Sequence, residues 1–203
     1  MKKVMKAIVT IVFLTFFLLL EGGAWVERFY GLLPEHAQPR WRRIGDEIYS
    51  TIGGYVTGNL AISLIAGVVS TAVLLALDVP FAVALGLLVA ILDLIPLAGA
   101  TIAAILVTTV AFLDSTTSGV IVLIFFILYQ QLENHVLQPV VYGRTVRLSP
   151  LAVLIAVLIG AELAGVVGAL AAIPVAGAIQ VILRDWLEHR RAKGGSAPEP
   201  TAV

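Results

Sequence analysis

Two acidic residues stand alone inside long apolar stretches of this sequence. Asp93 is the one ionisable residue in 79–113, and Glu162 is the one in 148–183. A carboxylate at membrane depth costs at least about 2.5 kcal/mol, so it should face water, a cation or a proton. Both residues are therefore candidates for carrying protons or cations, and they form a proton-exchanging pair if the fold brings them together. The alternative is that each lies at a turn near the membrane surface and is solvated.

Five further polar residues are spaced to share helix faces. Gln130 and Asn134 are four residues apart, and Glu133 adjoins them at the end of an apolar stretch. They either line a hydrophilic path or mark an ordinary helix end at the lipid headgroups. Asn59 and Ser63 are also four residues apart, and they hydrogen-bond either to a neighbouring helix or to a polar solute.

No pattern typical of a catalytic, cofactor or metal site occurs. The chain has no cysteine, no HExxH, no P-loop and no GxSxG elbow. Two separated acids are not sufficient for an aspartyl dyad, and His135 lacks the partners that a metal site needs. We therefore predict that the protein is not an enzyme, that it binds no cofactor or metal, and that His135 has no role.

The composition predicts how these residues are positioned. Apolar residues make up 60% of the 203 residues and charged residues 13%, which is too few charges to cover a soluble globule. Several uncharged runs approach the roughly 20 residues that cross a bilayer as a helix. Backbone groups in hydrocarbon must pair within their own segment. We therefore predict an all-α, polytopic transmembrane protein whose partner is the lipid bilayer, and no basic cluster indicates nucleic acid.

The chain divides into six predicted segments. These are an N-terminal transmembrane helix with an interfacial anchor (1–33), an amphipathic surface helix (34–57), a transmembrane helix with a first broken hairpin (58–113), a transmembrane helix and cytoplasmic loop (114–148), a second broken hairpin (149–186) and a disordered tail (187–203). The first segment resembles a signal peptide because Lys2, Lys3 and Lys6 precede its apolar stretch. The aromatic Trp25 and Phe29 favour a retained helix instead.

Each predicted hairpin is interrupted by helix-breaking residues. The first contains Pro96 and Gly99 shortly after Asp93, and the second is broken near Gly165. The arms are short for a full crossing, so the hairpins are either re-entrant or spanning. A shift of 70 residues aligns the two hairpins, which predicts a two-fold internal repeat and a transport site built from discontinuous helices. Pro96 and Gly99 therefore join the candidate transport path.

The charge distribution orients the chain. Ten basic residues fall on one predicted face and three lysines on the other, so the Arg-rich face and the C-terminus should be cytoplasmic. The small residues Gly67, Gly86, Gly160 and Gly168 let helices approach closely, which favours a homo-oligomer. The ten residues are Arg28, Arg40, Arg42, Arg43, Arg144, Arg147, Arg184, Arg190, Arg191 and Lys193.

Most of the chain resembles the autoinducer-2 exporter family of bacterial multi-span membrane proteins. The matching motifs are Asp78-Val79-Pro80, Ile95 to Gly99, Gln130 to Asn134 with Pro139 and Gly143, and Leu148-Ser149-Pro150 through Gly165 and Gly168 to Pro174. The resemblance implies export of small solutes, including autoinducer-2, and cation/proton antiport in some members. Family members usually exceed 300 residues, so this chain is expected to be a shortened member.

The first functional hypothesis is a transporter of a small polar solute or cation in the bacterial cytoplasmic membrane, coupled to protons or cations. The alternatives are a structural or assembly subunit and a shortened member without autonomous transport. If the protein is a transporter, Asp93→Asn or Glu162→Gln should abolish flux and leave expression intact. A scaffold should tolerate both changes. We also expect the helix that contains Gln130 to end at Pro139.

Overall fold

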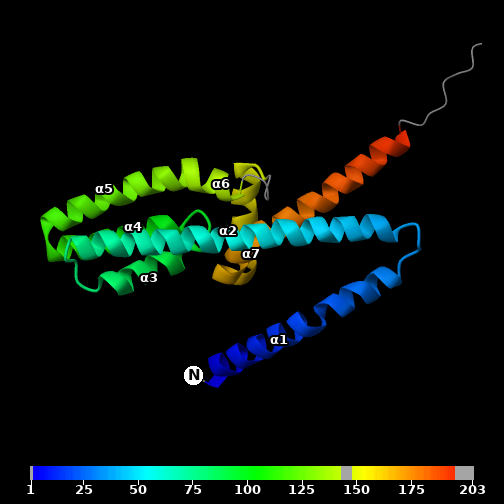
Figure 1. Cartoon of the computed structure of the whole chain (residues 1–203), viewed down its shortest axis with the longest axis horizontal. Coiled ribbons are helices and arrows are strands. Elements are labelled where there is room, and N and C mark those ends of the chain that lie inside the picture. The colour runs from blue at the N-terminus through cyan, green and yellow to red at the C-terminus, as the bar shows by residue number, and fades with distance from the viewer. Residues whose placement is uncertain (1, 143–147, 195–203) are drawn as a thin grey trace, which may run out of the picture. The chain divides into compact units, whose positions relative to one another are not determined.

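The computed structural model describes residues 2–142 and 148–194 and contains helices but no strand in this part of the chain (Figure 1). The elements are α1 (Lys2–Gly31), α2 (Gln38–Ala76), α3 (Ala82–Asp93), α4 (Gly99–Asp114), α5 (Thr116–Leu132), the π-helix η1 (Glu133–Leu137), α6 (Gln138–Tyr142) and α7 (Pro150–Gly194). Among the described residues, four helices are long and apolar enough to cross a membrane. The prediction of an all-α, polytopic membrane protein is therefore confirmed.

The chain forms two compact units, Met1–Glu47 and Ile48–Val203, and each is considered by itself. In the first unit, the apolar side chains of α1 are almost all exposed, as suits contact with lipid. Arg42, near the start of α2, donates two hydrogen bonds to the carboxylate of Glu27, at 2.6 and 2.7 Å. Its guanidinium group also lies 4.8 Å from the centre of the Tyr30 ring.

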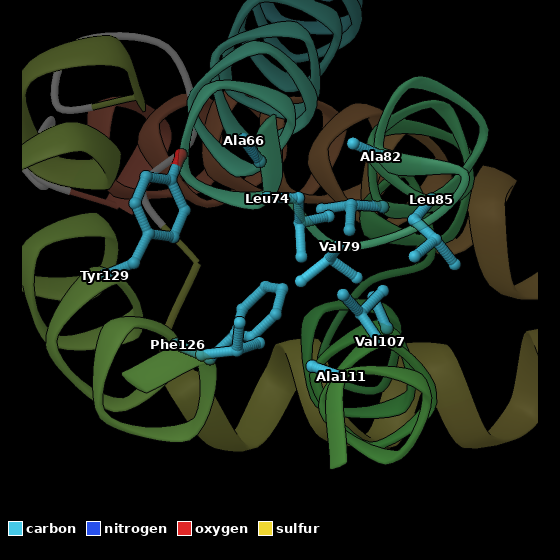
Figure 2. Close-up of a cluster of buried hydrophobic side chains, with 12 residues drawn as sticks. Ala66, Leu74, Val79, Ala82, Leu85, Val107, Ala111, Phe126 and Tyr129 are labelled. Atoms are coloured by element: carbon cyan, nitrogen blue, oxygen red, sulfur yellow. The ribbon is translucent and has the colours of Figure 1, made fainter. Parts of the chain in front are cut away.

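The second unit has a core made by four helices. In Figure 1, α3, α4 and α5 run alongside the second half of α2. Apolar side chains from all four helices and from the α2–α3 turn converge in Figure 2. These buried residues are Ala66, Leu74, Val79, Ala82, Leu85, Val89, Ala103, Val107, Ala111, Val122, Phe126 and Tyr129. The core packs the helices that carry the candidate site residues against one another.

Paired glycines bring neighbouring helices into close contact. A Cβ atom added to Gly67 of α2 would lie 2.9 Å from the Gly86 carbonyl oxygen, and one added to Gly86 of α3 would lie 2.8 Å from that of Gly67. Gly160 and Gly168 approach each other in the same way within α7. The close approach predicted for these four residues is confirmed, and it occurs between helical segments of this chain.

Both predicted hairpin breaks are confirmed. Helix α3 ends at Asp93 and α4 begins at Gly99, and between them Leu97 has a left-handed φ of 66°. A Cβ atom at Gly99 would collide with the carbonyl oxygen of Leu92, so the turn requires glycine there. The break in α7 lies at Gly165, whose φ of 60° and ψ of −140° suit only glycine.

The boundary of the predicted tail was wrong. We expected disorder from residue 187, but α7 continues to Gly194. The reason is that 187–193 contains neither glycine nor proline, and Arg190 stacks on Trp186 with 4.3 Å between the guanidinium carbon and the ring centre. The rest of the tail (195–203) and the loop 143–147, with its Gly143, Arg144 and Arg147, lie outside the described residues.

We expect Leu74→Ala to lower the free energy of unfolding by about 2 kcal/mol, because Leu74 is only 1% exposed and its loss leaves a cavity in the core. Lipid is as apolar as leucine, so the cost should come mainly from lost packing contacts. Thermal unfolding in detergent measures the change. Leu75→Ala is the matched control, since Leu75 is 56% exposed and should tolerate truncation. Equal effects of the two substitutions would contradict the core assignment.

Candidate functional site

A cavity of about 560 Å³ opens beside the break between α3 and α4. This volume lies within the range of roughly 300–1,000 Å³ that is typical of small-molecule sites. Helices α2, α3, α4, α5, η1, α6 and α7 all contribute to its walls. The lining residues are Tyr55, Asn59, Ile62, Asp93, Ile95, Pro96, Leu97, Ala100, Thr101, Gln130, Glu133, Asn134, Gln138, Pro139, Leu148, Val153 and Ile173. The cavity therefore combines polar side chains with an interrupted helix.

Six of the nine predicted transport-path residues line this one cavity. They come from segments up to 75 positions apart in the sequence and are Asn59, Asp93, Pro96, Gln130, Glu133 and Asn134. Gly99 does not line it but shapes the turn that does. Glu162 is exposed near the break in α7 and does not line the cavity. The structure thus places the acid of the first hairpin in the cavity, and the acid of the second outside it.

The carboxylate neighbour of Asp93 in the cavity is Glu133. The two residues are only 9% and 6% exposed, and both line the same cavity. Ser63 is buried on α2, and its hydroxyl has no hydrogen-bond partner among the described residues. No Lys, Arg or His is among the described residues that line the cavity. These walls attract cations and hydrogen-bond donors, and they disfavour anions.

Asn59 makes a hydrogen bond to a neighbouring segment of the chain, which is one of the two roles that its spacing left open. Its Nδ2 donates a 3.2 Å hydrogen bond to the carbonyl oxygen of Leu94. Leu94 directly follows α3, where helix carbonyls lack partners within the helix. Asn59 also lines the cavity. The amide therefore ties α2 to the helix break at the edge of the cavity.

The helix containing Gln130 does not end at Pro139 as predicted. It widens into the π-helix η1 at Glu133–Leu137 and continues as α6. Proline has no N–H, and its ring would clash with the carbonyl four residues earlier in an α-helix. A π-turn lengthens the repeat to five residues, as seen in the bond from the Gln138 N–H to the Glu133 carbonyl. The proline is thus accommodated within the helix, and the helical wall of the cavity extends past it.

The π-turn adds a site residue that sequence reasoning missed. Gln138 Nε2 donates to Glu133 Oε1 at 3.2 Å and to Asn134 Oδ1 at 3.1 Å. Glu133 Oε2 is buried and has no hydrogen-bond partner among the residues that the structure describes. A separation of five residues does not place side chains on one face of an α-helix, so spacing alone could not connect Gln138 with Glu133. The sequence feature that could have indicated this contact was Pro139, which lies inside a helical stretch beside a cluster of polar residues.

His135 belongs to the same turn but does not line the cavity. Its Nδ1 lies 2.9 Å from the carbonyl oxygen of Gln131, one turn earlier, and its side chain is exposed. Within 2–142 and 148–194, no group of three or more His, Cys, Asp or Glu residues is arranged to hold a metal ion. This hydrogen bond within the helix explains the position of the His135 ring.

Comparison with known proteins assigns the family. Residues 2–188 match the model described as "AI-2E family transporter". "Putative transport protein YrrI" of Bacillus subtilis (strain 168) is 28% identical over 89% of this chain and 51% of its own length. "Putative transport protein MT0215" of Mycobacterium tuberculosis (strain CDC 1551 / Oshkosh) is 34% identical over 89% and 51%.

A third relative carries the name of a solute. "AI-2 transport protein TqsA" of Escherichia coli (strain K12) is 32% identical over 66% of this chain and 40% of its own length. This chain spans about half the length of the first two relatives. With the family model covering nearly the whole sequence, the chain belongs to the AI-2E transporter family.

Proposed function

We propose that this chain supplies the solute-binding cavity of a membrane transporter for a small polar solute that is neutral or positively charged. The observation that supports this proposal is the cavity itself. It is large enough for a small molecule, and Asp93 and Glu133 line it beside a broken helix. Discontinuous helices with polar groups at their breaks are the form that binding sites take in many transporters. The name of the Escherichia coli relative makes autoinducer-2 the first solute to test.

Two neighbouring carboxyl groups also provide a means of coupling to ions. Asp93 and Glu133 are buried together, and the cavity residues described offer them no basic partner. Like charges in one site favour uptake of a proton or a cation. The sequence has no nucleotide-binding motif, which leaves an ion gradient, the solute's own gradient or a separate ATPase as the source of energy. Of these, we propose that a proton or cation gradient drives transport.

The short helices around the cavity support a re-entrant arrangement. Helices α3 and α4 have 12 and 16 residues, so they are about 18 and 24 Å long. A bilayer core is about 30 Å thick. We propose that this hairpin enters and leaves a cytoplasmic membrane on one face, with the Arg-rich side and the C-terminus in the cytoplasm. The exposed apolar surfaces of α1 and α5 suit lipid and further copies of the chain.

Reconstitution of the purified full chain tests the proposal. Liposomes containing the protein and an internal pH dye are loaded with autoinducer-2 or with Na⁺, and release is followed over time. We expect release above that of protein-free liposomes for at least one of these probes, with a change in internal pH if protons are exchanged. Correctly inserted protein that moves neither probe nor protons would favour an assembly subunit instead.

A further inference from the structure

Glu133 and Gln138 are bonded through their side chains although they are five residues apart. In an α-helix, residues five apart lie about 140° from each other around the axis, so their side chains diverge. In the π-turn the two residues come onto one face, and both line the cavity. The π-turn therefore favours this contact, and a regular α-helix does not.

The bond leaves the two carboxylate oxygens of Glu133 in different situations. Oε1 accepts from Gln138 Nε2, whereas Oε2 is buried and has no hydrogen-bond partner within 2–142 and 148–194. The same Nε2 also holds Asn134 Oδ1, so one amide fixes two cavity side chains. A buried acceptor without a partner is costly unless an ion, a proton or a donor group occupies it.

We propose that Gln138 is a positioning residue for the cavity. From the π-turn that Pro139 imposes, it holds Glu133 so that Oε1 is occupied and Oε2 serves as the acceptor for a cation or for a donor group of the solute. This deepens the proposed function, because it rests on the same cavity. It makes the charge of the cavity depend on the π-turn as well as on the acidic residues.

The test reads the charge of the cavity without requiring a known solute. The natural chain has no cysteine, so Thr101→Cys places a single thiol in the cavity wall. Its rates of reaction with a trimethylammonium-ethyl and a sulfonato-ethyl methanethiosulfonate are measured on the full chain in liposomes. The ratio of the cationic rate to the anionic rate reports on negative charge near the thiol. Only protein that is monodisperse in gel filtration before reconstitution is used.

In the Thr101→Cys background, Glu133→Gln should lower this ratio about tenfold, because a nearby charge acts in opposite directions on the two reagents. Gln138→Leu should lower the ratio most of the way to the Glu133→Gln value. Gln131→Leu is the matched control, since Gln131 is an exposed amide on the same helix that does not line the cavity. A change confined to protein stability would leave the ratio of the folded protein unaltered. A parental ratio in Gln138→Leu, together with a lowered ratio in Glu133→Gln, overturns the proposal.

The dependence on the π-turn is tested by rescue. Pro139→Ala permits an ordinary α-helix, which should carry Gln138 off the face of Glu133 and lower the ratio. An α-helix places the residue at i+4, Leu137, on that face instead. The double variant Leu137→Gln with Pro139→Ala should therefore recover the ratio. A parental ratio in Pro139→Ala, or no recovery in the double variant, counts against the π-turn.

Failure of this proposal can be told apart from failure of the proposed function. If Gln138→Leu keeps the parental ratio while solute release still depends on Glu133, the cavity transports and Gln138 does not position Glu133. If Gln138→Leu lowers the ratio but neither autoinducer-2 nor Na⁺ is released, the positioning is supported and the transport proposal fails.

Discussion

Asp93→Asn is expected to reduce solute release from liposomes at least about tenfold while the protein still inserts and folds. Asparagine has nearly the shape of aspartate, but it can neither carry a negative charge nor bind and release a proton. A hydrogen bond to a charged group contributes about 1.5–3 kcal/mol, which corresponds to tenfold or more in binding. Initial rates of release at several internal concentrations, with the amount of inserted protein determined by gel, measure the change.

Glu162→Gln is the matched control for this experiment. The sequence predicted that the two acids act alike, but Glu162 is exposed and does not line the cavity. We therefore now expect Glu162→Gln to retain most of the release. If Asp93→Asn transports normally, the cavity has no anchor for a solute or proton and the proposed site is wrong. If Glu162→Gln alone is inactive, the path runs through the second break instead.

Gly99→Ala is expected to destabilise the protein by at least about 1–3 kcal/mol, the usual cost of forcing extra atoms into a packed site. The added Cβ would collide with the backbone carbonyl of Leu92, which has no side-chain freedom to move aside. To relieve this collision, the turn must open and displace Asp93 and Pro96 from the cavity. Thermal unfolding in detergent and the monodisperse fraction in gel filtration measure the loss.

Gly53→Ala is the matched control, because a Cβ atom at this position meets no neighbouring atoms. Gly53 lies within α2, and nothing is within 4 Å of the position where its Cβ would be. Alanine is favoured over glycine in a helix by about 0.5–1 kcal/mol, so this variant should be as stable as the parent or slightly more so. If Gly99→Ala and Gly53→Ala unfold at the same temperature, the turn does not require glycine at position 99.

The helices and their breaks could be predicted because membranes impose simple rules on sequence. Long uncharged runs must be helical. The residues that interrupt them, Pro96, Gly99 and Gly165, can be recognised as helix breakers from the sequence alone, without knowledge of the tertiary structure. The polar residues that would gather in one cavity were also visible as exceptions to apolar surroundings. Asp93, Gln130 and Glu133 are three of them.

The partner of Asp93 could not be predicted in this way. The apparent repeat favoured Glu162, because both acids occupy matching places in the two hairpins. Tertiary packing decided otherwise, since Asp93 and Glu133 line the same cavity, whereas Glu162 is exposed and does not line it. The contact of Gln138 with Glu133 was invisible for a different reason. It depends on a local change of helical repeat, whereas the spacing rules assume one repeat throughout.

The kink at Gly165 leaves the first arm of α7, residues 150–163, about 21 Å long. Together with α3 and α4, this gives three helices shorter than the hydrocarbon region they are expected to enter. A bilayer relieves such mismatch by thinning locally, at a cost of fractions of a kcal/mol per Å. Lipids with longer acyl chains would resist this deformation. The rate of solute release should therefore depend on the acyl-chain length of the liposomes.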